Sequence, residues 1–141
     1  MGAWAGLFAM TVLWGLREPL AALFSNDQAV VAMAIPLVIV VCFFHFFDSI
    51  QTQITLVLRA WHVTAAPMFV HLAALWGIGL GGGWWLTYVY PASGGPWAEW
   101  LSGAAGFWVA GAIALALATA GVTGLLWYVW RASEDTPTRT R

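Results

Sequence analysis

Charge is the property that this sequence has least of. Only 8% of its 141 residues are charged, and the basic ones are five arginines with no lysine. A soluble domain carries about 25% charged residues, so the composition excludes an ordinary water-soluble globule. The net charge of −1 also excludes a nucleic-acid-binding surface, because such a surface needs a basic patch that faces phosphates.

Cysteine is scarce, and a basic N-terminal segment is missing. The one cysteine, Cys42, lies in an apolar run, which excludes a disulfide framework within the chain and a cysteine-based zinc site. Residues 1–16 carry no charge, whereas a signal peptide begins with a basic region. Because the apolar helix pattern starts without a polar flank, the sequence predicts a piece of a longer protein.

Long apolar runs make up most of the chain. They cover residues 29–47, 60–98 and 100–130, and each exceeds the roughly 18 residues that indicate a membrane span. We therefore predict an all-α polytopic membrane protein whose partner is the lipid bilayer. The predicted transmembrane region is 1–131, with spans at about 1–17, 29–59, 67–90 and 103–130, followed by a polar, disordered tail at 132–141.

The positions of the few charges predict the orientation. Positive residues are retained in the cytoplasm during insertion. The second connector and the tail hold the arginines Arg59, Arg131, Arg139 and Arg141, and the first and third connectors hold the acids Asp27 and Glu99. Both termini are therefore expected on the cytoplasmic side of a bacterial inner membrane. Arg17 departs from this pattern, and the adjacent Glu18 can neutralise it.

The start of the second span has the features of a helix cap. Ser25, with Gln28 three residues later, fits a capping box, in which the two side chains bond backbone N–H groups at a helix start. Asp27 lies where a helix N-terminus favours negative charge. We expect the helix to begin near Ala29.

Glycine is concentrated at residues 77–82, in the third span. The spacing matches a dinucleotide-binding fingerprint, but that motif works only between a β-strand and a helix, so we reject this interpretation. The glycines instead predict close helix approach or local unwinding. A series of small residues on the fourth span predicts the same kind of packing: Ala112, Ala116, Ala120 and Gly124.

Asp48 is the residue most indicative of function. It lies eleven residues before Arg59, so it is about 16 Å from that inner boundary and near the middle of a hydrocarbon core about 30 Å thick. An ionised Asp there costs about 2.5 to 3.5 kcal/mol and is retained mainly where it faces protein or water. Asp48 is therefore expected to bind a proton or a coupling cation. The alternative is a protonated Asp that hydrogen-bonds a neighbouring helix.

Other polar residues share the Asp48 face of the second span. They are His45, Thr52, Thr55 and Arg59, with Gln51 on the flank. The Thr and Gln side chains either support ion binding or bond adjacent helices. His45 either relays protons or packs, and His62 and His71 are weaker candidates. Arg59 is most simply an inner-face anchor.

Pro36 lies twelve residues before Asp48 in the same predicted helix. It removes one backbone donor and frees the carbonyl of Ala32, so the helix can bend there. Such a bend either serves the movement of a transporter helix or is harmless. No acid pair, nucleophile with a nearby base, or metal-spaced histidine cluster favours an enzyme, and no bound cofactor is expected.

Several segments together resemble the multidrug and toxic-compound extrusion (MATE) transporters. They are residues 16–19, 22–27, 47–51 and 58–59, followed by 76–80 and 106–108 with Gly111. The resemblance covers nearly all of the chain and corresponds to helices nine to twelve of a twelve-helix transporter built as two lobes. It implies an all-α fold and partnership with the N-terminal helices that this chain lacks.

The resemblance also implies the function. It implies a cation-coupled antiporter that expels bulky, amphipathic, often cationic small molecules, with Asp48 at the position of the acid that binds the coupling Na⁺ or H⁺. Family members pair that acid with a Glu that this chain lacks, and Leu56 and Ala60 replace the usual glycines around the Leu–Arg pair. Two rivals are a free-standing four-helix drug transporter that dimerises and a non-transporting membrane scaffold or gene remnant.

Overall fold

The computed structural model describes residues 2–134, with side chains from Trp4 onward, and this part of the chain is helical with no strand. The predicted all-α polytopic fold is confirmed. In chain order the elements are α1 (Gly2–Gly15), α2 (Arg17–Phe24), α3 (Gln28–Ala60), α4 (Ala65–Leu72), the π-helix η1 (Ala73–Gly81), α5 (Gly82–Trp84), the π-helix η2 (Trp85–Val89), the 3-10 helix η3 (Tyr90–Ser93), α6 (Ala98–Leu101) and α7 (Ala104–Glu134).

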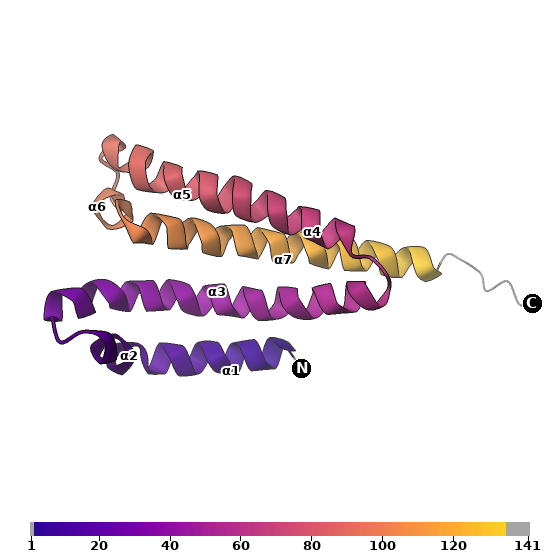
Figure 1. Ribbon diagram of the computed structural model, residues 1–141, viewed down its shortest axis with the longest axis horizontal. Helices are drawn as coiled ribbons and strands as arrows, with labels where there is room; N and C mark the ends of the chain where they lie inside the picture. The colour runs from indigo at the N-terminus through magenta and orange to yellow at the C-terminus, as the bar shows by residue number, and fades with distance from the viewer. Residues whose placement is uncertain (1, 135–141) are drawn as a thin grey trace, which may run out of the picture.

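The long helices lie side by side (Figure 1), and successive ones along the chain run in opposite directions, so that the neighbours α3 and α7 run in the same direction. Helix α3 packs between α1 and α7, and α7 packs between α3 and the continuous helical segment from α4 to η2. The start of α1 and the end of α7 point toward the end of the molecule that holds the α3–α4 connector (Figure 1). Besides these two long neighbours, α3 packs against the short helix α2.

Within residues 2–134, three helical segments are long and apolar enough to cross a membrane: Gln28–Ala60, Ala65–Ser93 and Ala104–Glu134. A fourth crossing requires Trp4–Gly15 and Arg17–Phe24 to act as one broken span, and these two pieces meet at an angle of 65°. The predicted tail at 132–141 begins within α7, and its remainder from residue 135 lies outside the described residues.

Helix α3 begins with a cap that differs from the predicted one. Asp27, rather than Ser25, is the N-cap residue, and its carboxylate accepts a hydrogen bond of 2.9 Å from the Ala29 N–H. Ser25 Oγ instead accepts from the Asp27 N–H at 3.1 Å. The capping-box prediction is wrong because the carboxylate directly precedes the helix, where it meets both the free N–H groups and the positive end of the dipole.

The α3–α4 connector is short and sharply turned. Helix α3 ends at Ala60, and His62 has a φ of 60°, a left-handed conformation that is uncommon outside glycine. The Val63 N–H donates to the Leu58 carbonyl at 2.9 Å, which closes the last turn of α3. The connector therefore directs α4 back along the side of α3.

The small-residue seam of α7 lies on a different face from the predicted one. Ala110, Ala114 and Ala118 are buried, whereas Ala120 is exposed and a Cβ at Gly124 would meet nothing within 4 Å. The two series are offset by two residues, or about 200° around a helix, so they face opposite sides. Of the predicted series, Ala112 and Ala116 are half-buried beside Phe43 and Phe47 of α3, so the prediction of a packing face holds at these two residues and is wrong at Ala120 and Gly124.

Close approach at the glycine-rich segment is confirmed. A Cβ built on Gly79 would lie 3.4 Å from the Ala114 Cβ, and one on Gly82 would lie 3.7 Å from the Ala110 Cβ. The segment is also wound as the π-helix η1 from Ala73 to Gly81. Small residues on both helices thus bring α7 and η1 into contact, the packing mode that membrane helices favour.

Candidate functional site

The C-terminal half of α3 and the first turns of α4 enclose a polar cavity of about 440 Å³. It lies beside the connector that joins the two helices. Helix α3 supplies Asp48, Gln51, Thr52, Thr55, Leu56 and Arg59, and the connector and α4 supply Thr64, Pro67, Met68 and His71. We refer to this space as the Asp48 cavity.

The structure brings five of the predicted site residues to this one cavity. They are Asp48, Gln51, Thr52, Thr55 and Arg59, spaced along three turns of a single helix. Asp48 and Thr55 are partly exposed, whereas Thr52 and Arg59 are exposed. The shared helix face predicted from the 3.6-residue repeat is therefore the face that lines the cavity.

The other two predicted residues lie elsewhere. His45 is exposed and does not line the cavity, although it lies only three residues before Asp48. Pro36 lies within α3, which continues through it without a break, and it lines a separate cavity. The structure therefore groups at one cavity the predicted site residues from Asp48 to Arg59 and separates from it the two that precede Asp48.

The Asp48 carboxylate has no ion-pair partner among residues 4–134, where the ion pair present is Arg17–Glu18 at 3.5 Å. The same part of the chain holds no group of three or more His, Cys, Asp or Glu side chains that could bind a metal ion. A cation at Asp48 would therefore rest on one carboxylate together with neutral oxygens. The cavity-lining side chains that carry such oxygens are Gln51, Thr52, Thr55 and Thr64.

Gln51 is the most buried polar residue of the site, with 1% of its surface exposed. Its Nε2 faces Nδ1 of His71 on α4 in a short side-chain contact, and the other ring nitrogen lies 3.3 Å away. Its Oε1 is buried and has no hydrogen-bond partner. An unpartnered buried amide oxygen is rare in native proteins, so its position in a cavity-lining side chain calls for an explanation.

His71 was only a weak candidate on the sequence pattern alone. The feature that could have identified it is that an ionisable side chain lies inside a predicted membrane span. It lies four residues after Pro67, so both point to the same side of α4, and both line the cavity. A single helix pattern does not show which neighbouring helix that side meets, so the pairing with Gln51 was not predicted.

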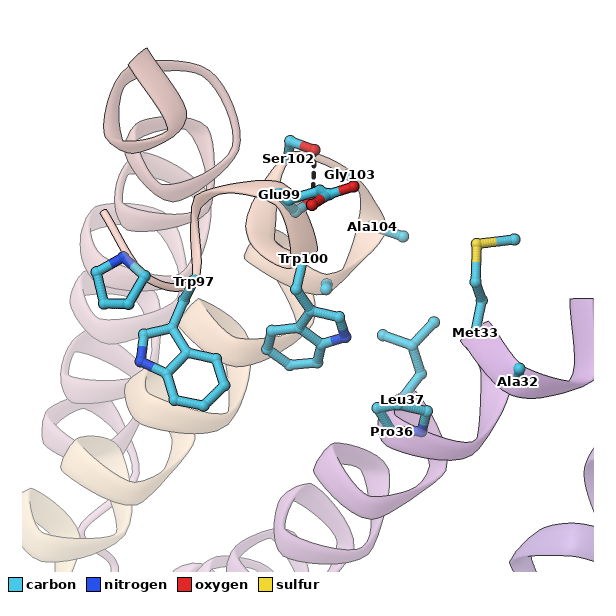
Figure 2. Close-up of a pocket in the computed structure, with 12 residues that line it drawn as sticks. Ala32, Met33, Pro36, Leu37, Trp97, Glu99, Trp100, Ser102, Gly103 and Ala104 are labelled. Carbon is cyan, nitrogen blue, oxygen red and sulfur yellow. Dashed lines mark hydrogen bonds between the residues drawn. The ribbon is translucent and has the colours of Figure 1, made fainter. Parts of the chain in front are cut away.

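A larger cavity of about 910 Å³ lies at the opposite end of α3. Its walls come from the N-terminal half of α3 and from the segment around α6, and Figure 2 shows Met33, Pro36 and Leu37 across from Trp97 and Trp100. Glu99 is its only charged residue, and the Ser102 hydroxyl donates to the Glu99 carbonyl at 2.7 Å. This space is apolar and aromatic, in contrast to the Asp48 cavity.

Comparison with known proteins identifies the family. The MatE family model matches residues 1–85, which include α1 to α4 and therefore the whole wall of the Asp48 cavity. The chain belongs to the MatE family. The MATE resemblance predicted from the sequence motifs is thus confirmed, and the apolar helices are those of a membrane protein family.

Named relatives agree with this assignment. The probable multidrug resistance protein NorM of Aromatoleum aromaticum is 40% identical over 140 residues, which is 98% of this chain and 29% of that protein. The NorM protein of Chromobacterium violaceum is 34% identical over 126 residues, 89% of this chain and 25% of that protein. The multidrug resistance protein PmpM of Pseudomonas aeruginosa is 42% identical over 65 residues, 46% of this chain and 14% of that protein.

The MATE chain therefore spans less than a third of the length of these relatives. No solved structure matches it.

Proposed function

We propose that this MATE chain forms part of a cation-coupled multidrug efflux antiporter, in which Asp48 binds the coupling Na⁺ or H⁺. The observation that carries the proposal is that Asp48 lines a cavity with four other predicted polar residues on one face of α3. The printed names of the NorM and PmpM relatives support multidrug resistance as the physiological role.

The mechanism follows from the cost of a carboxylate in hydrocarbon. A bound cation offsets the charge of the Asp48 carboxylate, and a proton neutralises it. Either event changes the electrostatics between α3 and α4. Moving one charge through the membrane field contributes about 2.3 kcal/mol per 100 mV, which is available to drive the exchange. We propose that ion uptake at Asp48 changes helix packing and releases an amphipathic, cationic substrate on the outer side.

The proposed setting is a bacterial inner membrane with both ends of the chain on the cytoplasmic side. The described structure points the start of α1 and the end of α7 toward the connector that carries His62 and follows Arg59 (Figure 1). The positive-inside rule places that arginine-bearing end in the cytoplasm. The N-terminal helices found in longer MATE relatives are the proposed structural partners.

A chimeric transporter tests the proposal. The part of this chain that matches the Aromatoleum NorM protein would replace the corresponding segment of that protein, and the chimera would be reconstituted in liposomes. We expect a Na⁺ or H⁺ gradient to drive ethidium export. Asp48→Asn should remove this coupling, because the neutral amide cannot exchange a proton or balance a cation.

Glu99→Gln is the matched control, since Glu99 is an exposed carboxylate outside the Asp48 cavity and should leave coupling intact. Unchanged coupling in Asp48→Asn would remove Asp48 from the mechanism. A chimera that inserts but moves no ions or drug under any gradient would favour a non-transporting scaffold.

A further inference from the structure

A hydrogen bond from α7 to α3 ends at the peptide group that carries Asp48. The Thr119 hydroxyl on α7 donates to the Phe47 carbonyl of α3 at 3.2 Å and to the Leu115 carbonyl of its own helix at 2.8 Å. Both acceptors are carbonyl oxygens, so the direction of each bond is fixed. Because the Phe47 carbonyl and the Asp48 N–H belong to one planar peptide unit, the bond acts on the backbone from which the Asp48 side chain projects.

Neither partner needs this bond in order to be satisfied. A threonine inside a helix bonds the carbonyl four residues earlier, as Thr119 does with Leu115. Thr123, one turn later, does the same with the Thr119 carbonyl at 2.6 Å. A carbonyl inside a helix accepts from the N–H four residues later and keeps a second lone pair. The bond between Thr119 and Phe47 therefore serves to link the two helices.

Thr119 lies in a closely buried stretch of α7 and is itself 7% exposed. The nearby side chains of Leu115, Ala118 and Val122 are at most 1% exposed, and Ala114 is fully buried against η1. Close packing of this kind leaves little room for a helix to turn. Helix α7 therefore holds the Thr119 hydroxyl in one position relative to its neighbours.

An apolar groove of about 250 Å³ runs between α3 and α7 beside this bond. Its walls include Phe43 and Phe47 of α3 and Ala112 and Ala116 of α7. Apolar contacts are non-directional, and the groove leaves space beside the Phe47 ring, so packing on this side fixes the rotation of α3 only loosely. A hydrogen bond weakens when its angle changes. The Thr119 bond therefore constrains a rotation that the apolar contacts leave free.

We infer that Thr119 is a positioning residue that sets the rotation of α3 at Asp48 and keeps the carboxyl directed toward the Asp48 cavity. In the described structure α7 lines no part of that cavity, so Thr119 acts through the α3 backbone rather than by contact with the ion. Without the bond, α3 also adopts rotations that turn Asp48 away, and only a fraction of the molecules is ready to bind. The inference rests on the proposed role of Asp48 as the acid that binds the coupling ion.

The first test uses the chimeric transporter described above, with ethidium as the exported compound. Thr119→Val keeps the shape of the side chain and removes the hydroxyl. We expect the Na⁺ or H⁺ concentration that gives half-maximal export to rise roughly fivefold, the effect of one lost hydrogen bond on the population that is ready to bind. The maximal export rate should be unchanged, because Asp48 is intact. Thr119→Ser retains the hydroxyl and should behave as the wild type.

Thr123→Val is the matched control, since it removes a hydroxyl that donates within α7, and it should leave the half-maximal concentration unchanged. Equal increases in Thr119→Ser and Thr119→Val would overturn the inference, because the effect would then come from packing. No increase in Thr119→Val would also overturn it and leave the Asp48 site standing. An unsubstituted chimera that inserts but shows no coupled export under either gradient would overturn the proposed function and the inference with it.

A second measurement observes the bond itself. The dipeptide Phe-Asp occurs once in the sequence, at Phe47 and Asp48, so ¹³C-carbonyl phenylalanine and ¹⁵N-aspartate together give one solid-state NMR cross-peak for this peptide group in the full chain. We expect Thr119→Val to shift the carbonyl resonance, and Thr119→Ser and Thr123→Val to leave it close to the wild-type position. A resonance that does not move in Thr119→Val would overturn the inference whatever the export assay shows.

Discussion

The Asp48 cavity and the cavity beside α6 share helix α3 but differ in chemistry. The smaller one, of about 440 Å³, is lined by a carboxylate, a guanidinium, an imidazole, an amide and hydroxyls. The larger one, of about 910 Å³, is lined by apolar and aromatic side chains around a single acid. Converging polar groups, rather than volume, therefore identify the site where ion chemistry is possible.

The difference follows from where the sequence places its polar residues. From Ala29 to Phe44 the helix has no ionisable side chain except Cys42, whereas the three turns from Asp48 to Arg59 carry five polar side chains on the cavity side. One continuous helix thus has an apolar half suited to lipid-like contacts and a polar half suited to ions. Substitutions that place a polar group in the apolar half, or that remove one from the polar half, test this contrast.

The largest expected effect comes from placing a carboxyl in the apolar half. Leu37→Asp should lower the free energy of unfolding by up to about 3 kcal/mol, because the apolar cavity offers it no partner. Unfolding by SDS titration in mixed micelles measures the change. Leu37→Met, which conserves volume, should cost less than about 1.5 kcal/mol. Equal costs for the two variants would contradict the contrast between the cavities.

The small-residue seam between α7 and η1 is the second place to test. Ala114 is fully buried against η1, so Ala114→Leu should lower the free energy of unfolding by about 1 to 3 kcal/mol through overpacking. Ala120→Leu adds the same atoms at an exposed position and should leave the free energy of unfolding nearly unchanged. Thermal unfolding of the two variants decides between the observed seam and the opposite face, and a larger cost at Ala120 would contradict the structure.

Pro36 gives a smaller effect confined to the apolar half. Pro36→Ala restores an N–H opposite the Ala32 carbonyl and should raise the free energy of unfolding by about 1 kcal/mol. Amide exchange of the residues around position 36 should become slower than in the wild type, and Na⁺ affinity should be unchanged. Pro19→Ala is the control, because Pro19 lies in the first turn of α2, where no intrahelical donor is lost. A changed Na⁺ affinity in Pro36→Ala would show that the two halves are coupled.

Thr52 gives the smallest expected effect and lies in the polar half. Thr52→Val keeps the shape but removes one neutral oxygen from the Asp48 cavity, so Na⁺ affinity should fall about threefold, near the value of one neutral hydrogen bond. Equilibrium ²²Na⁺ binding measures the change. Thr11→Val removes a hydroxyl that donates to Leu7 O in α1 and should leave Na⁺ affinity unaltered. Equal losses in the two variants would place Thr52 outside the ion site.

Much of the fold and half of the site could be predicted from the sequence. Apolar runs long enough to cross a bilayer predicted the helical membrane fold. The 3.6-residue repeat predicted that Asp48, Thr52 and Thr55 share one helix face. Both predictions depend on the geometry of a single helix. The motif order around Asp48 added the family, which the MatE match confirms.

Predictions that depend on two helices meeting were less successful. Helix α7 is so rich in alanine that small residues occur on opposite faces, and only the placed helices show that one face meets Gly79 and Gly82 while Ala112 and Ala116 of the other lie beside α3. The π-helical winding of η1 also shifts side chains out of the α-helical phase, which a regular repeat does not anticipate. For the same reason His71 could not be matched to Gln51 before the two helices were placed together.

The length of α3 has a consequence for the bilayer itself. Its 33 residues extend about 50 Å, whereas the hydrocarbon layer is about 30 Å thick and helices lean by at most about 40°. Part of α3 must therefore emerge from the hydrocarbon, and the depth of Asp48 depends on which end is anchored. Lipid chain length then becomes a physical control on this carboxyl: short-chain lipids bring water closer to it, and long-chain lipids hold water away.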